Sequence, residues 1–236
     1  MASANKTLLV IGAGPGIGRA VATMFASKRH DNIVLVARRA EQLKAEQSAV
    51  EAALSSSGKA GKVKIRTYAV DITHTAALLR ALDDADAAFG KPECVFFNAA
   101  RVLPSTLMEH DVEEIEYDLK ITVSALYIVA QRYMPHLLEL ATSYPNKPGL
   151  IVTSSALPFE PIPELFALSL TKAAQFNLMR SMHMTYAPRG VHVGVINVGG
   201  MVSEDHERFN PANIADKTWE WYADAQPEVN RFELVI

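Results

Sequence analysis

The chain has 236 residues, of which 49% are hydrophobic and 21% charged, and its formal net charge is −3. This length and composition are those of an ordinary globular protein that buries a core of its own. Because the chain has no basic excess and no run of about 18 apolar residues, we expect no nucleic-acid or membrane partner and a soluble, cytoplasmic protein.

Short apolar runs, typical of buried parallel strands, alternate along the chain with segments whose apolar residues recur at helical spacing. The expected strands are 7–13, 32–38, 63–71, 93–100, 149–156 and 191–200, with a short last strand at 232–236. The expected helices are 16–28, 40–54, 75–89, 112–140 and 165–186, and residues 201–218 are expected to form a loop with short helices before a helical 218–224. This alternation predicts a single-domain α/β fold over residues 1–236, with a Rossmann-type doubly wound parallel sheet. The only cysteine, Cys94, lies in an apolar run and is expected to be a buried strand thiol.

A glycine-rich turn, GAGPGIGRA at 12–20, joins the first expected strand to the first expected helix. Its glycines are Gly12, Gly14, Gly16 and Gly18, and Ile17 opens the helix. Glycine allows positive φ and a close approach of the backbone to a bound group, and the N–H groups of a helix start favour a pyrophosphate. Because the motif follows a strand and opens a helix, it predicts a dinucleotide site; the alternative is a tight turn without a ligand.

The second expected strand ends in Ala37, Arg38 and Arg39, where an acidic residue usually meets a free ribose 2′-hydroxyl. Arginine instead suits a 2′-phosphate, which it binds through paired, charge-assisted hydrogen bonds. The sequence therefore favours NADP(H) over NAD(H), and the alternative is a solvated arginine pair that leads into a helix.

With these motifs placed, the chain resembles the short-chain dehydrogenase/reductase family over about residues 5–225. Gly12, Gly16 and Gly18 match the family's G-x-x-x-G-x-G motif. The VDIT segment matches the end of the family's third strand, and this resemblance implies that Asp71 and Ile72 line the adenine pocket.

Two further segments depart in part from the family's motifs. FNAA at 97–100 resembles N-N-A-G and keeps Asn98 and Ala99, with Ala100 in place of the last glycine. NVGGMVS at 197–203 resembles N-P-G-x-x-x-T, and it keeps Gly199 and offers Ser203 where the family's threonine lies near the nicotinamide amide. The resemblance adds these residues to the expected coenzyme site.

The resemblance also implies catalytic positions, and one of them departs from the family. Ser155 and Lys172 lie where the family has its serine and lysine, but Leu168 occupies the position of the tyrosine and Thr122 that of the asparagine. In a typical member the tyrosine gives a proton to the carbonyl oxygen, the serine holds that oxygen, and the lysine lowers the tyrosine pKa and holds the nicotinamide ribose. Leucine can neither donate nor accept a proton, and loss of a general acid costs about 10²–10⁴ in rate.

Three interpretations of this site compete. The first is an NADP(H)-dependent oxidoreductase for a small, apolar carbonyl or imine compound, with another acid in place of the tyrosine. The second is a non-redox isomerase, cyclase or lyase on the same scaffold. The third is a non-catalytic, nucleotide-binding regulatory protein, since a fold alone does not choose a function.

Several side chains are candidates for the missing acid: Ser169, Thr171, Tyr127, Arg101, Glu160, Glu164 and His183. Each has a structural alternative, namely a core aromatic for Tyr127, a solvent-facing charge for Arg101, exposed loop acids for the two glutamates and a packing or surface role for His183. The hydroxyls of Ser169 and Thr171 are poor acids without a relay. The histidines show no metal-ligand spacing, so no metal site is expected.

Residues 201–222 correspond to the family's substrate lid, and Met201, Phe209, Trp219 and Trp221 offer it an apolar lining. Because Trp219 and Trp221 are two apart on a helix, they cannot face the same side, and one of them is expected to lie in the core. The family often pairs through its long helices, here 112–140 and 165–186, so a homodimer or homotetramer is expected, with ordinary packing on the sheet as the alternative.

Overall fold

The computed structural model describes residues 6–143, 147–224 and 232–236 of the predicted single domain. Seven parallel strands form one sheet in the order β3-β2-β1-β4-β5-β6-β7. The strands are β1 (Thr7–Ile11), β2 (Asn32–Ala37), β3 (Lys64–Ala69), β4 (Cys94–Phe97), β5 (Gly149–Ser155), β6 (His192–Val198) and β7 (Glu233–Val235). This topology confirms the predicted doubly wound α/β fold, in which the chain order reverses between β1 and β4.

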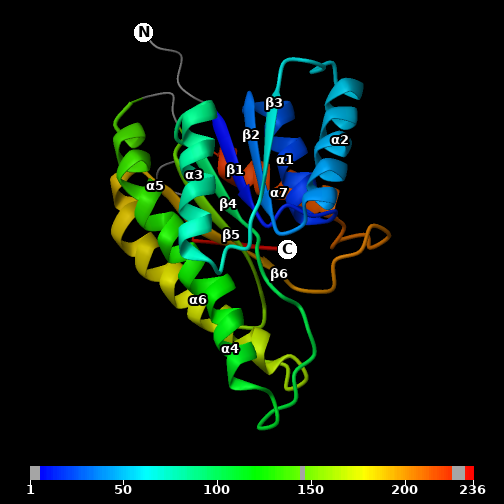
Figure 1. Ribbon diagram of the computed structural model, residues 1–236, viewed down its shortest axis with the longest axis vertical. Helices are drawn as coiled ribbons and strands as arrows, with labels where there is room; N and C mark the ends of the chain where they lie inside the picture. The colour runs from blue at the N-terminus through cyan, green and yellow to red at the C-terminus, as the bar shows by residue number, and fades with distance from the viewer. Residues whose placement is uncertain (1–5, 144–146, 225–231) are drawn as a thin grey trace.

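Helices cover both faces of the sheet (Figure 1). Those on one face are α3 (Thr75–Phe89), α4 (Val112–Leu119), α5 (Ala125–Ala141) and α6 (Phe166–Tyr186), and those on the other are α1 (Ile17–Lys28), α2 (Ala40–Ser56) and α7 (Pro211–Ala223). A π-helical segment η1 (Lys120–Ser124) joins α4 to α5, and a 3₁₀ turn η2 (Ala187–Arg189) follows α6.

Strand β1 shows why the apolar runs fold in this way. Its residues alternate between the two faces, so that Leu8 and Val10 pack in the core under α1 and α2, while Leu9 and Ile11 pack in the core under α3 and α5. All four are at most 1% exposed. Burial of each such side chain contributes about 1.5–3 kcal/mol, which only a strand covered on both faces provides.

Strand and helix ends differ from the prediction by a few residues, and two elements differ more. The expected helix 112–140 is one helical column from Val112 to Ala141, but the η1 segment interrupts its α-helical hydrogen bonding, and Pro135 lies inside α5. The expected loop at 201–218 ends earlier, because Asn210 caps α7 by accepting a hydrogen bond from the Asn213 amide at 2.8 Å.

The two tryptophans of α7 pack inward, and the expectation that they line a substrate lid is wrong. Trp219 meets Phe25 of α1 edge to face, with ring centroids 5.1 Å apart. Trp221 meets His192 of β6 at 4.3 Å, and a Cβ on Gly194 would lie 2.4 Å from its ring. Both rings therefore pack against the core under α1, and residues 211–222 form part of that layer.

Cys94 is fully buried in β4, as predicted, and burial raises the pKa of its thiol. In the part of the chain that the structure describes, no helix has the length and apolar character needed to cross a membrane. The same residues contain no cluster of three or more His, Cys, Asp or Glu side chains that could hold a metal ion.

Candidate active site

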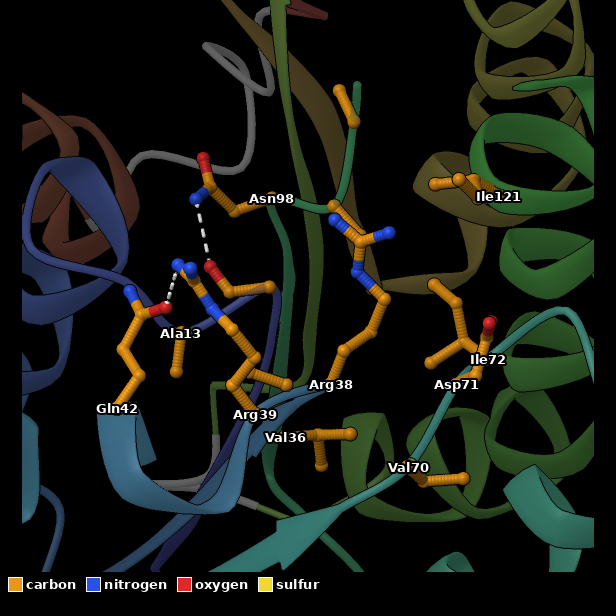
Figure 2. Close-up of a pocket in the computed structure, with 14 residues that line it drawn as sticks. Ala13, Val36, Arg38, Arg39, Gln42, Val70, Asp71, Ile72, Asn98 and Ile121 are labelled. Atoms are coloured by element: carbon orange, nitrogen blue, oxygen red, sulfur yellow. Dashed lines mark hydrogen bonds between the residues drawn. The ribbon is translucent and has the colours of Figure 1, made fainter. Parts of the chain in front are cut away.

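A cavity of 270 Å³ opens at the carboxyl ends of β1, β2, β3 and β4 (Figure 2). Its lining comes from the end of β2, from the loops that follow the four strands, and from α2 and η1: Gly12, Ala13, Val36, Ala37, Arg38, Arg39, Gln42, Val70, Asp71, Ile72, Asn98, Ala99, Ala100 and Ile121. The carboxyl edge at the topological switch point is where open α/β sheets bind ligands. Six residues expected from the sequence for the coenzyme line this cavity: Gly12, Arg38, Asp71, Ile72, Asn98 and Ala99.

Close packing requires two glycines of the turn, Gly12 and Gly18. Gly12 has φ +92°, and a Cβ there would lie 2.5 Å from the Ala99 amide nitrogen. A Cβ on Gly18 would lie 2.7 Å from the Gly12 carbonyl oxygen. At Gly16, which caps α1, a Cβ would meet nothing within 4 Å, and no side chain caps the helix start. The first amides of α1 are thus left for an anion.

The remaining members of the motif, Gly14 and Ile17, lie in the same turn and at the start of α1 but not in the cavity lining. A Cβ on Gly14 would be in ordinary contact with Gln42, at 3.5 Å. The structure therefore brings the backbone of the turn to one side of the cavity, with Gln42 of α2 beside it.

Asp71 lies on the opposite wall, after β3, and accepts three hydrogen bonds. The Thr73 amide and hydroxyl donate to Oδ1 at 3.0 and 2.8 Å, and the Tyr117 hydroxyl donates to Oδ2 at 3.0 Å. Partial burial acts to raise the pKa of this carboxyl, but the three donors outweigh it, and the net pKa is lowered. Asp71 is therefore an ionised acceptor at neutral pH, suited to amino or hydroxyl groups of a ligand.

The two arginines at the end of β2 differ in their contacts. Arg39 donates a hydrogen bond to Oε1 of Gln42. Among the described residues Arg38 makes no hydrogen bond or ion pair, and Figure 2 shows its side chain between those of Arg39 and Ile72. The fork of Arg38 is therefore available to a phosphate at the cavity.

Ser155 and the hydrogen-bond partner of Lys172, Thr153, both lie at the carboxyl end of β5. Ser155 ends β5 and is partly exposed, and its Oγ accepts a hydrogen bond from the Leu157 amide at 3.3 Å. Lys172 of α6 donates from Nζ to the Thr153 carbonyl of β5 at 2.7 Å and to Gln175 Oε1 at 3.0 Å. Burial lowers the pKa of Lys172 to about 8.

Thr122 lies in η1, and its carbonyl accepts a hydrogen bond from Gln175 Nε2 at 2.9 Å. The Gln175 amide thus connects η1 to Lys172. Ile121, which precedes Thr122, lines the cavity. The hydrogen bonds from Thr122 to Gln175, from Gln175 to Lys172 and from Lys172 to Thr153 therefore connect the cavity wall to β5.

Comparisons with known proteins agree with this geometry. The sequence profile of the family described as short chain dehydrogenase matches residues 6–213. The chain belongs to the short-chain dehydrogenase family. An uncharacterized oxidoreductase of Staphylococcus aureus strain USA300 is 24% identical over 241 residues, which cover 98% of this chain and 96% of that protein.

Two solved structures of the short-chain dehydrogenase fold are similar over nearly the whole chain. L-sorbose reductase from Gluconobacter frateurii, complexed with NADPH and L-sorbose, aligns with a TM-score of 0.83 at 19% identity and covers 98% of this chain and 95% of its own. An NADPH-bound short chain oxidoreductase from Pseudomonas aeruginosa PAO1, which contains an atypical catalytic center, aligns with a TM-score of 0.82 at 19% identity and the same coverage. At this identity the likeness shows the shared fold.

Leu168, predicted to replace the short-chain dehydrogenase tyrosine, is buried on α6 one turn before Lys172. The two hydroxyl residues that follow it, Ser169 and Thr171, donate to backbone carbonyls. Ser169 Oγ donates to the Leu165 carbonyl at 3.0 Å, and Thr171 Oγ1 donates to the Leu168 carbonyl at 3.0 Å. Neither points a free proton into the site.

Tyr127 is 54% exposed on α5, so the alternative that it is a core aromatic is wrong. Arg101 is not a solvent-facing charge either, because its side chain is 16% exposed and pairs with Asp118 at 2.6 Å and Glu114 at 2.5 Å. These contacts hold the Arg101 guanidinium against α4.

The other three candidate acids lie in different surroundings. Glu160 and Glu164 are exposed in the segment between β5 and α6. His183 is partly buried, and its Nδ1 lies 2.8 Å from the Val193 carbonyl oxygen. The structure therefore supports the exposed-acid and packing interpretations for these residues.

Gly199 and Ser203 do not line the cavity. The Gly199 amide donates to the Ile236 carbonyl at 3.0 Å, and the Ser203 amide donates to the Phe209 carbonyl at 3.3 Å. Phe209 packs on Gly200, where a Cβ would lie 2.2 Å from its ring, while Met201 is 87% exposed. A substrate lid in the part of 201–222 that precedes α7 stays a prediction.

Several site residues were not expected from the sequence. Val36 and Val70 lie at the ends of β2 and β3, close in sequence to the predicted site residues Arg38 and Asp71. That position could have identified them as part of the cavity wall. Gln42 and Ile121 come from helices whose pattern is that of ordinary packing. Gln175 is a fully buried polar side chain three residues after Lys172, and this spacing on one helix face was a signal for a partner of the lysine.

Proposed function

We propose that this chain is an NADP(H)-dependent oxidoreductase that acts on a small, apolar carbonyl or imine compound. The observation that carries the proposal is the cavity at the carboxyl edge, with the open turn at Gly16 on one side and the unengaged Arg38 guanidinium at its rim. The neighbours that bind NADPH support the same coenzyme.

The residues present fit a dinucleotide. The amides that follow Gly16 would hold the diphosphate, Asp71 and Ile72 would contact the adenine, and Arg38 would pair with a 2′-phosphate. Asn98 holds the glycine turn through its hydrogen bond to the Gly12 carbonyl, and Ala99 lies against Gly12. When bound, the nicotinamide supplies or accepts a hydride.

Ser155 and Lys172 would act on the substrate side. Ser155 is partly exposed, and its hydroxyl can donate a hydrogen bond to a carbonyl oxygen. Lys172, together with Gly199 and Ser203, would contact the nicotinamide end, as the family resemblance implies. The Thr122 backbone carbonyl accepts a hydrogen bond from Gln175, whose Oε1 in turn accepts one from Lys172. Thr122 would thereby help to position Lys172.

Two loops that flank this end carry exposed apolar side chains, which supports an apolar substrate. The Ser105 amide in the loop after β4 donates to the Glu164 carbonyl in the segment before α6 at 2.9 Å, and Ser105 Oγ accepts from the Ala167 amide at the start of α6 at 3.2 Å. Their exposed apolar side chains are Val102, Leu103, Leu107, Met108, Phe159 and Ile162.

Leu168 favours a second candidate, a non-redox enzyme or a nucleotide-binding regulator on the same scaffold, because the position predicted for the acid carries an apolar side chain. The test is titration of the purified protein with NADPH and NADH by fluorescence, followed by a panel of apolar ketones and cyclic imines. Oxidation of NADPH in step with product supports the oxidoreductase. Tight NADPH binding with product formed at constant NADPH supports the non-redox enzyme, and absence of nucleotide binding contradicts every candidate.

A homodimer or homotetramer stays a prediction, as does a cytoplasmic location. The outer surface of α5 and α6 carries exposed Tyr127, Leu170 and Met184, which would be available to a second copy. Light scattering of the purified protein measures the number of copies.

A further inference from the structure

Lys172 is a buried cation with unusual surroundings. Its side chain is 7% exposed, and its ammonium group has three N–H donors, of which two are used by the Thr153 carbonyl and by Gln175 Oε1. Both acceptors are uncharged. Among the described residues no carboxylate pairs with Lys172, and one N–H is left over.

These surroundings make Lys172 a better acid than an ordinary lysine. Burial alone lowers its pKa to about 8. Among the described residues no charged or titratable side chain of α6 itself or of the elements packed against it (β5, β6, α4, η1 and η2) adds to this effect. A proton donor is most effective when its pKa lies near the working pH, which an exposed lysine near 10.4 does not satisfy.

The hydrogen bonds of Lys172 place its ammonium group at the carboxyl end of β5, the edge of the sheet at which the cavity opens. Lys172 is anchored on β5 two residues before Ser155, and Gln175 ties it to η1 beside the cavity. Leu168 lies four residues earlier on the same face of α6, and it leaves this face without a competing proton donor.

We propose that Lys172 itself is the catalytic acid of this chain and gives a proton to the carbonyl oxygen of the substrate. The proposal rests on the oxidoreductase function proposed above. In the reduction the carbonyl carbon gains a hydride from a nicotinamide coenzyme, and the C=O π electrons move to oxygen. An O–H bond then forms as an N–H bond of Lys172 breaks, and the neutral amine takes a proton back from solvent.

The first test measures the proton on Lys172 without any turnover. In protein labelled with ¹³C-lysine, the Cε resonance that is absent from the Lys172→Arg or Lys172→Met protein belongs to Lys172. We expect it to titrate near pH 8 in the wild-type protein with NADP⁺ bound. Titration above pH 10, with the other lysines, would overturn the proposal.

The second test uses isatin, a neutral aromatic ketone, with NADPH. The rate constant kcat/KM is expected to fall tenfold per pH unit above the pH found by NMR, because the acid must be protonated. In Lys172→Arg this fall should move beyond pH 10, and in Lys172→Met the rate should drop by about 10²–10⁴-fold. Lys44→Met, at a 73% exposed site on α2, is the matched control and should leave the profile unchanged.

A lysine that only positions the coenzyme gives a different result, in which Lys172→Arg changes the KM for NADPH but leaves the fall in kcat/KM near pH 8 in place.

A third test uses an N-methyl-3,4-dihydroisoquinolinium ion, which needs no proton when it accepts a hydride. If the protein reduced this cation but not isatin, it would transfer a hydride without a working acid, and the proposal would be overturned. If the wild-type protein fails to bind NADPH, the proposed function itself falls; if it binds NADPH and reduces isatin without dependence on Lys172, only the role of Lys172 falls.

Discussion

The Asn98 side-chain amide donates a hydrogen bond of 2.9 Å to the carbonyl oxygen of Gly12. The two residues are 86 positions apart in the chain, and each follows a neighbouring strand of the sheet. The Asn98 backbone amide also donates to the Ile11 carbonyl, at 2.7 Å. Asn98 thus fixes the first peptide of the glycine turn, whose later amides face the proposed diphosphate site.

Asn98→Ala should weaken both the fold and coenzyme binding. It leaves a partly buried carbonyl without its donor, which costs about 1–3 kcal/mol in the free energy of unfolding. We expect NADPH affinity to fall about tenfold because the turn is no longer fixed. Urea unfolding and calorimetric titration measure the two effects, and Asn177→Ala, at an exposed site on α6, is the control. Unchanged affinity in the folded variant would contradict this role of Asn98.

Arg38→Ser should separate NADPH from NADH. The charge-assisted bond to a 2′-phosphate is worth about 1.5–3 kcal/mol, which corresponds to a loss of about 10–100-fold in NADPH affinity. NADH affinity should change little, because its ribose carries no phosphate. Fluorescence titration with both coenzymes measures the ratio.

Arg66→Ser, at an exposed position in β3, is the matched control for Arg38. Arg39→Ser should give a smaller effect than Arg38→Ser, since Arg39 already donates to Gln42. An equal loss for NADPH and NADH in Arg38→Ser would argue against recognition of the 2′-phosphate.

The architecture was predictable because each central strand is a continuous apolar run bounded by turn residues. Leu8–Ile11 and Cys94–Phe97 show this pattern, and the structure buries both completely or almost so. The interruption of the long helix by η1 was not predictable, since residues 120–124 have no proline or glycine and their apolar spacing fits an α-helix. The local sequence pattern also could not predict that Trp219 packs on Phe25, because α7 and α1 are far apart in the sequence.

The site divides in the same way. Gly12, Arg38, Asp71 and Asn98 were expected because each directly follows a strand, and parallel strands bring their carboxyl ends to one edge. Gln42 was not expected, since it reaches the cavity only through the way α2 packs beside the turn.

His30 should make stability depend on pH in mildly acidic solution. It is fully buried, and burial lowers its pKa to about 4 against the opposing effect of Glu93. Between pH 6.5 and about 4 the unfolded chain binds a proton that the folded chain does not, so the free energy of unfolding falls as the pH falls through this window. The loss from this group is on the order of 2–3 kcal/mol, and above pH 6.5 it contributes no slope.

Urea unfolding at pH 7 and pH 5 measures this effect. His30→Phe, which keeps an aromatic ring stacked on Phe25, should reduce the difference between the two pH values. His74→Gln is the control, because His74 is 75% exposed and should leave the difference unchanged. A pH dependence that is the same in His30→Phe and wild type would show that other groups are responsible.

Leu168→Tyr should increase carbonyl reduction if Ser155 and Lys172 are placed as proposed. A phenol one turn before Lys172 would have its pKa of about 10 lowered by the neighbouring cation and would supply a second proton donor. The gain in kcat with NADPH and isatin is expected to be about tenfold or more, measured by the loss of NADPH absorbance. Leu168→Phe adds the same ring without the hydroxyl, so it controls for the strain of a larger side chain at this buried position. Equal rates in the tyrosine and phenylalanine variants, both folded and binding NADPH, would mean that the substrate oxygen does not lie within reach of position 168.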